Sequence, residues 1–262
     1  MTSPASDPVA LHQPPDGQHR QAALDAVQQD IVACTLCVDA GFISASLPIF
    51  HGHAGQRLMI VGQAPGPSAG ERPLPYTGAT GRTLQGWLER AGFPPGALHE
   101  QFYLTSLTKC FPGPAIGGKG DRPPSAREIA LCARHLDREI ALVRPEIVVS
   151  LGRLAAERLD PTARKLPLAE LVGSIRPAAR AGHLFLLVPL PHPSGVSRWL
   201  NDPAHRVRLE VALGVLGRES RVGSRKSEVV SRRSALPRPP RRSGHALSEA
   251  SGVSFSREQS VP

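Results

Sequence analysis

The sequence predicts an α/β fold, a three-layer sandwich in which helices cover both faces of a central, mostly parallel sheet of four strands. Short apolar runs alternate along the chain with segments of helical periodicity. The first run is apolar at four successive positions, as in a strand that is buried on both faces. The expected strands are Leu58–Val61, Phe102–Leu107, Glu146–Leu151 and Leu184–Val188.

Five segments around these strands have the spacing of amphipathic helices, and several carry end signals. Ser125 and Glu128 make a capping-box pattern, and Gly92 is placed as a C-terminal cap. Asp202 and Pro203 supply an N-cap and a proline at the first helical position. The expected helices are Gln21–Val32, Thr80–Ala91, Ser125–Leu142, Arg153–Leu159 and Pro203–Leu216.

The first strand ends in a short loop of small residues, Gly62–Gly66. Its two glycines allow a ligand to approach the backbone closely. In open α/β sheets, ligands bind at the loops that follow the carboxyl ends of strands. We therefore expect a ligand loop here, with an ordinary strand-to-loop turn as the alternative. The next segment, residues 67–81, is rich in proline and glycine and should form an irregular loop beside the site.

Positive charge is concentrated at the end of the chain. The formal net charge is +9, and from Arg218 onward ten basic residues face four glutamates, so this segment alone carries +6. The segment is rich in Ser, Pro and Arg and cannot bury enough apolar surface to offset the entropy of ordering. We expect a flexible segment at 1–20, one folded domain at 21–217 and a disordered basic tail at 218–262. Such a tail is available to polyanions, or merely keeps the protein in solution.

The sequence gives no sign of membrane insertion or secretion. It has no run of eighteen apolar residues, and Met1–Arg20 is polar and contains prolines. We therefore expect a cytoplasmic protein. Disulfides are rare in that reducing compartment, which shifts the interpretation of the cysteines toward metal binding or reactivity.

Four cysteines form the first candidate site. Cys34 and Cys37 are separated by two residues, and Cys110 and Cys132 follow later in the chain. Four thiolates suit a tetrahedral zinc ion or a four-iron cluster, and their spacing favours neither. A thioredoxin-like pair at Cys34 and Cys37 would leave the other two cysteines unexplained. Four unrelated buried thiols are the remaining alternative.

Several motifs occur in a fixed order along the chain. They are Cys34-x-x-Cys37, Gly62–Gly66, Arg72–Gly78 followed by a helix, Tyr103–Cys110, Cys132 within a helix, and His192-Pro193-Ser194. In this order the chain resembles the iron-sulfur uracil-DNA glycosylases, families four and five of that superfamily, from Cys34 to about Leu216. The resemblance implies a [4Fe-4S] cluster on the four cysteines, with zinc as the alternative, and a central four-stranded parallel sheet.

The chain departs from this family at residues that activate water. Family four usually has glutamate at the position of Gln63, and the classical uracil glycosylases have aspartate at that of Ala64. Family five usually has an aspartate directly after the threonine-glycine step, where this chain has Ala79. Ser106 replaces an asparagine that reads the base, so we expect a broader choice of deaminated bases. Glu71, in the neighbouring loop, is a carboxylate that could substitute.

The resemblance also implies roles for individual residues. His192 would donate a hydrogen bond to the leaving base, and Gln63 would orient water. Tyr76 would cover the face of the extruded base. A structural loop histidine and a core-packing tyrosine are the alternatives. The remaining expected substrate-binding residues are Gly62, Ala64, Pro65, Gly66 and Ser106, and the expected DNA-binding residues are Pro193, Ser194, Gly195 and Arg198, with Trp199 as a wedge in the base stack.

We therefore expect an enzyme of base excision repair, a monomeric DNA glycosylase. This hydrolase would cleave the N-glycosidic bond of uracil or another deaminated base in DNA and leave an abasic site. One alternative is a weak or inactive relative that binds abasic or damaged DNA, because the usual carboxylate is missing. Another is an iron-sulfur or zinc protein with a redox or scaffold role.

Overall fold

The computed structural model describes residues 17–67, 74–117, 120–195 and 197–234. The chain divides into two units, Met1–Arg225 and Lys226–Pro262, and the fold given below is that of the first. Residues 17–20, part of the segment expected to be flexible, begin the first helix. Residues 1–16 lie outside the described part of the chain.

The centre of the fold is a five-stranded sheet with the strand order β2-β1-β3-β5-β4. Its strands are β1 (Leu58–Gly62), β2 (Phe102–Ser106), β3 (Ile147–Leu151), β4 (Arg176–Arg180) and β5 (His183–Leu190). The four predicted strands correspond to β1, β2, β3 and β5, and their pairings are all parallel. The expected α/β class and mostly parallel sheet are confirmed.

The expected number of strands was wrong, because β4 adds an antiparallel edge strand beside β5. Ala181 and Gly182 connect the two strands, with φ angles of 51° and 72°. Positive φ at both positions is the geometry of a tight hairpin turn. The sequence of β4 lacks an apolar run because Ala178 is its buried residue. Pro177 is tolerated because an edge strand has one unpaired side.

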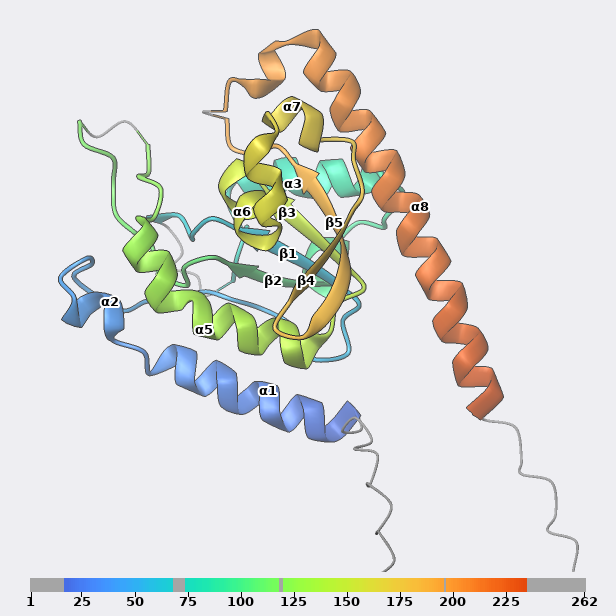
Figure 1. Ribbon diagram of the computed structural model, residues 1–262, viewed down its shortest axis with the longest axis horizontal. Coiled ribbons are helices and arrows are strands. Elements are labelled where there is room, and N and C mark those ends of the chain that lie inside the picture. Colours follow the sequence, from blue (N-terminus) through green and yellow to red (C-terminus); the bar gives the residue numbers. More distant parts are fainter. Residues whose placement is uncertain (1–16, 68–73, 118–119, 196, 235–262) are drawn as a thin grey trace, which may run out of the picture. The chain divides into compact units, whose positions relative to one another are not determined.

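Helices cover both faces of the sheet (Figure 1). The five predicted helices correspond to α1, α3, α5, α6 and α8. Single-turn helices escaped prediction because one turn is too short to show periodicity. Within the described residues, no helix has both the length and the apolar character needed to cross a membrane. The helices are α1 (Gly17–Val32), α2 (Leu36–Asp39), α3 (Ala79–Arg90), α4 (Ala97–Glu100), α5 (Ala126–Val143), α6 (Arg153–Leu159), α7 (Leu168–Leu171) and α8 (Pro203–Ser234), with 3-10 turns at Pro161–Lys165 and Trp199–Asn201.

The strands bury side chains on both faces, which explains the continuous apolar run of β1. Ile60 packs in a core cluster with Leu84 of α3 and Leu213 of α8. Its neighbour Met59 packs in the opposite cluster with Leu136 of α5. Successive side chains of a strand point to opposite faces, so each layer of helices takes alternate residues. The sheet is therefore the middle of three layers.

The structure tests one predicted helix cap and one predicted helix end. The capping box at the start of α5 is confirmed, since Ser125 and Glu128 each accept a hydrogen bond from the other's backbone N–H. In contrast, α8 does not end near Leu216 but continues to Ser234. Residues 218–234 are thus helical where we expected disorder, because no proline interrupts the chain before Pro237. Residues 235–262 lie beyond the described part.

A buried ion pair joins α5 to the end of β2. Lys109 Nζ lies 2.7 Å from Glu139 Oε2, and their side chains are 2% and 0% exposed. The ammonium also donates to Thr105 Oγ1 (2.6 Å) and to the carbonyl of Ser106 (2.8 Å). Glu139 in turn accepts hydrogen bonds from the Tyr103 and Thr105 hydroxyls. A charge this deeply buried is stable only with such partners.

We expect Glu139→Gln to lower the free energy of unfolding by about 3–5 kcal/mol, because the Lys109 ammonium would stay buried without a counterion. Urea denaturation measures this loss. Asp30→Asn is the matched control, since Asp30 pairs with Arg138 on the surface, where both side chains are about half exposed. That change should lower stability by less than about 1 kcal/mol. Equal losses in the two variants would contradict an ionised pair at Lys109 and Glu139.

Candidate functional site

A cleft of about 620 Å³ opens where the parallel strands end. The loops that follow β1, β2 and β5 meet there, as expected for the carboxyl edge of an α/β sheet. The start of α3 and the loop before α5 complete its wall. The described residues that line it include Gly62–Pro67, Leu74–Gly81, Thr105, Ser106, Gly120–Arg122, His192, Ser194, Gly195 and Ser197.

Most of the predicted site residues lie in this cleft. Those lining it are Gly62, Gln63, Ala64, Pro65, Gly66, Tyr76, Ser106, His192, Ser194 and Gly195. Two predicted DNA-binding residues lie outside the lining, since Pro193 is buried and Arg198 is exposed beyond it. Trp199, the expected wedge, is half-buried and stacks on His205 with ring centroids 4.2 Å apart. Glu71 falls outside the described residues.

The loop after β1 is held against the segment that follows β2. The carbonyl of Gly62 accepts a hydrogen bond from Leu107 N (2.9 Å), and that of Gln63 accepts one from Thr108 N (3.2 Å). A side chain at Gly62 would force Tyr76 to move, because a Cβ there would lie 2.7 Å from the Tyr76 hydroxyl. The glycine therefore allows the loop after β1 and the Tyr76 side chain to pack in close contact.

Tyr76 is held in an unusual backbone conformation. Its φ of 61° places a bulky residue in the left-handed region, where strain is expected. Gly81 makes this possible, because a Cβ on it would lie 1.5 Å from the Tyr76 carbonyl oxygen. The tyrosine is half-buried, packs on the core and lines the cleft. Burial raises the pKa of its phenol, which therefore stays neutral.

His192 is arranged as a neutral hydrogen-bond donor. The backbone N–H of Ser194 donates to its Nδ1 (3.3 Å), and the Ser194 hydroxyl lies 2.9 Å from the same atom. Because Nδ1 accepts a hydrogen bond, the proton of the neutral ring is assigned to Nε2. Burial lowers the pKa of His192, although the charge of Asp121 partly opposes this shift. The hydrogen bonds of the His192 ring to described residues both involve Nδ1, which leaves the Nε2–H available to a ligand.

Asp121 is a cleft residue that sequence reasoning missed. It lies in the turn-rich segment 113–124. Neither periodicity nor a motif there distinguishes an acidic residue of a binding site from one that is merely solvated. The structure brings this segment to the cleft wall opposite residues far away in the chain. Proximity of that kind depends on tertiary contacts and has no local sequence signal.

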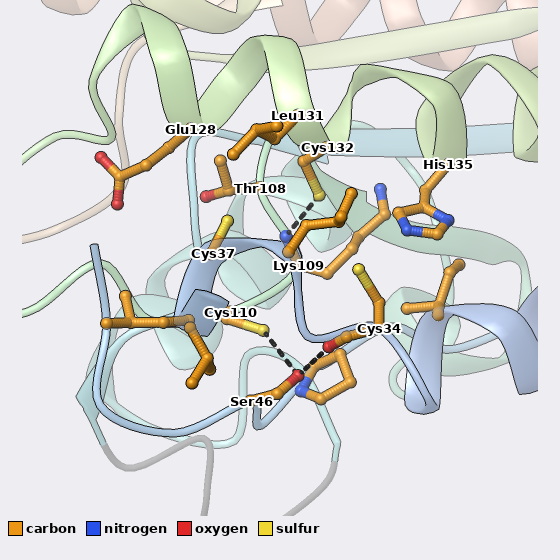
Figure 2. A pocket seen from close by; sticks show the side chains of 15 residues that line it. Cys34, Cys37, Ser46, Thr108, Lys109, Cys110, Glu128, Leu131, Cys132 and His135 are labelled. Atoms are coloured by element: carbon orange, nitrogen blue, oxygen red, sulfur yellow. Dashed lines mark hydrogen bonds between the residues drawn. The ribbon is translucent and has the colours of Figure 1, made fainter. Parts of the chain in front are cut away.

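The four cysteines gather in a second, apolar pocket. Cys34 follows α1, Cys37 lies on α2, Cys110 follows β2, and Cys132 lies on α5. Figure 2 shows the four side chains around one space. All four are free thiols. Hydrogen bonds fix some of them, including one from Lys109 N to Cys132 Sγ (3.3 Å).

The thiols in this pocket are poorly suited to carry charge on their own. Burial, followed by the neighbouring cysteines, raises the pKa of Cys37 to about 11. His135, only 1% exposed, also borders the pocket (Figure 2). In the described part of the chain, neither of its ring nitrogens has a hydrogen-bond partner. The same part contains no group of three or more His, Cys, Asp or Glu side chains arranged around a single metal ion.

Comparison with known proteins points to one family. Residues 49–213 match the family model described as the uracil DNA glycosylase superfamily. The chain is 29% identical over 131 residues to a type-4 uracil-DNA glycosylase of Sulfurisphaera tokodaii, which covers 50% of this chain and 55% of that protein. It is 26% identical over 176 residues to a type-4 uracil-DNA glycosylase of Archaeoglobus fulgidus, and the match covers 66% of this chain and 83% of that protein. It is 30% identical over 143 residues to a type-4 uracil-DNA glycosylase of Pyrobaculum aerophilum, and the match covers 54% of this chain and 68% of that protein.

We expect Gly81→Ala to disrupt the cleft, because its methyl group would overlap the Tyr76 carbonyl and displace that residue. The matched control is Gly86→Ala on the same helix, where a Cβ has no neighbour within 4 Å. The control should raise stability by about 0.5–1 kcal/mol, since alanine favours a helix over glycine. Thermal unfolding measures the stability of both variants, and tyrosine fluorescence reports the displacement of Tyr76. A Gly81→Ala protein as stable as the control would contradict the close contact.

Proposed function

The chain belongs to the uracil DNA glycosylase superfamily, and we propose that it hydrolyses the N-glycosidic bond of uracil or another deaminated base in DNA, leaving an abasic site. The observation that carries this proposal is the single cleft shared by the Gly62–Gly66 loop, Tyr76 and the Nε2–H of His192. The matching family model and the named relatives both point to this chemistry.

The cleft suits a base that has been rotated out of the DNA. Tyr76 offers a neutral aromatic face on which such a base could stack. Cleavage leaves an anionic base, so a donor on its carbonyl oxygen stabilises the transition state. His192 supplies that donor without carrying a charge of its own. Backbone amides of the loop after Gly62 would add further donors.

The choice of base depends on Ser106. Its hydroxyl lines the cleft at the end of β2, beside Gly62. A hydroxyl both donates and accepts, so it discriminates uracil from cytosine less sharply than an oriented amide. We propose that hypoxanthine and xanthine are accepted alongside uracil.

The cysteine pocket is proposed to hold a [4Fe-4S] cluster. The residues fit such a group, because four sulfur donors from four segments converge on one apolar space. His135 supports this assignment, since buried nitrogens without partners are rare unless a polar group is present. When bound, the cluster would supply four iron–thiolate bonds that hold its ligands together. The cysteines would then clamp α1 and α2 to α5 and to the end of β2.

DNA is the proposed partner, and we propose that the protein acts on it as a monomer in the cytoplasm, at the nucleoid. Ser194 and Gly195 lie at the cleft rim, where small residues let a phosphate approach backbone amides. Arg198, exposed nearby in the chain, would make a phosphate contact. The basic residues beyond Leu216 would add attraction that does not depend on sequence.

A second candidate function is binding of abasic or damaged DNA without efficient cleavage. The specific observation that favours it is the side chain of Gln63, an amide at a cleft position where a carboxylate would activate water. An amide positions water but is a poor base. Single-turnover excision compared with binding of an abasic oligonucleotide separates the two candidates.

We expect His192→Ala to slow single-turnover excision by about a hundredfold to a thousandfold, the effect of removing one oxyanion donor. Gln63→Ala should have a smaller effect, because an amide only positions water. His183→Ala is the matched control, since His183 lies at the other end of β5 and contacts the carbonyl of Pro145. Full activity of His192→Ala, with an active wild type, would refute this site assignment.

Protein purified without oxygen should be brown and contain about four irons per chain, as expected for ligation by four thiolates. Cys132→Ser should lose iron and unfold at a lower temperature, because Cys132 links α5 to the other ligands. Iron analysis, visible absorption and thermal unfolding provide the measurements. Ser46→Ala is a milder comparison, since Ser46 contacts the Cys110 sulfur at 3.8 Å without being a ligand. Colourless protein with one zinc per chain would rule the cluster out.

A further inference from the structure

The described lining of the cleft contains one carboxylate, that of Asp121. Glycosidic cleavage gives a sugar with positive charge at C1′ and requires water to attack that carbon. The loop after β1 and the start of α3 offer no carboxylate at Gln63, Ala64 or Ala79. Asp121 comes to the same cleft from another segment of the chain, the loop that precedes α5.

The carboxylate of Asp121 is turned toward the loop after β1. A Cβ built on Gly66 would lie 3.8 Å from Asp121 Oδ2, so the oxygen is within reach of that loop's backbone. The negative charge of Asp121 also acts on His192, which lines the same cleft. The carboxylate therefore lies between the two loops that would bind the base and its sugar.

The backbone on both sides of Asp121 is fixed. Asp121 forms a bridge with Pro114, and Arg122 N donates to the carbonyl of Gly113 (3.1 Å). The guanidinium of Arg122 makes two hydrogen bonds to the Glu128 carboxylate, at 2.7 and 2.8 Å. A planar guanidinium that binds a carboxylate through two bonds has little freedom to rotate.

Glu128 extends this support into the helix that follows. It is 2% exposed and belongs to the capping box of α5 with Ser125. Arg122 and the capping box together hold the pKa of Glu128 at about 2, so the carboxylate stays charged and the pair stays intact. Arg122, the neighbour of Asp121 in the chain, is thus held in place by Glu128. This fixes the backbone at Asp121, as a preorganised catalytic group requires.

We propose that Asp121 is the catalytic carboxylate of this enzyme, and that it orients the attacking water and accepts its proton. This inference rests on the glycosylase function proposed above. The water oxygen forms a bond to C1′ while the bond from C1′ to the base nitrogen breaks, and that electron pair leaves with the base. The proton released by water passes to Asp121 and then to solvent. The leaving base is held by the Nε2–H of His192.

This arrangement also gives Gln63 a consistent role. Its amide lines the same cleft and could hold the water by hydrogen bonding while Asp121 takes the proton. The negative charge of Asp121 would in addition favour the positive charge that develops on the sugar. The work of one carboxylate would then be shared between two residues from different loops.

The test is single-turnover excision of uracil, hypoxanthine and xanthine from oligonucleotides by the full chain. Asp121→Asn keeps the size of the side chain and should slow excision by about a hundredfold or more. Asp25→Asn, an exposed aspartate on α1, is the matched control and should be unchanged. Binding of an abasic oligonucleotide should be retained by Asp121→Asn, which would show that the cleft is still formed.

A second variant tests the chemistry rather than the fold. Gln63→Glu placed in the Asp121→Asn background returns a carboxylate to the cleft and should recover at least tenfold of the lost rate. Wild-type activity in Asp121→Asn would overturn the inference, as would a double variant no faster than Asp121→Asn. A wild-type protein that excises none of the three bases would instead refute the proposed function itself.

Discussion

The buried ammonium of Lys109 is the interaction on which the core, the cleft and the cysteine pocket all depend. Its charge is balanced by Glu139 of α5 at 2.7 Å. The same ammonium holds the carbonyl of Ser106, whose hydroxyl lines the cleft. The backbone N–H of Lys109 donates to Cys132 in the second pocket. One residue therefore connects the sheet, the cleft and the cysteine pocket, because buried charges tolerate little movement away from their partners.

Close backbone approaches give the cleft its shape. Gly62 and Gly81 each lie where a methyl group would collide with Tyr76. Tyr76 itself adopts a left-handed conformation that the contacts around it must maintain. Tyr76 in this strained conformation and the Gly62–Gly66 loop thus line the same cleft. Rigid placement of this kind reduces the reorganisation needed when a base enters.

The electrostatics of the cleft suit a reaction in which charge separates. A neutral imidazole that donates through Nε2–H would stabilise an anion without attracting the phosphate backbone as a cation would. A carboxylate in the same cleft, that of Asp121, would suit the cationic sugar of the proposed reaction. Partial burial of His192 keeps it neutral, since desolvation disfavours the charged ring. In the proposed reaction, the two groups would complement the two charges that form as the glycosidic bond breaks.

The sequence by itself determined the α/β class, four of the five strands, the capping box of α5 and the residues of the Gly62–Gly66 loop, because these depend on local periodicity and on residues adjacent in the chain. Only the tertiary structure decided that β4 completes the sheet, that α8 runs to Ser234, that Trp199 stacks on His205, and that Asp121 lies in the cleft. An edge strand with one buried side chain has no apolar run to reveal it. A lone aspartate in a turn can be recognised as a site residue only when folding brings it into the same cleft as His192, because the two residues are far apart in the sequence.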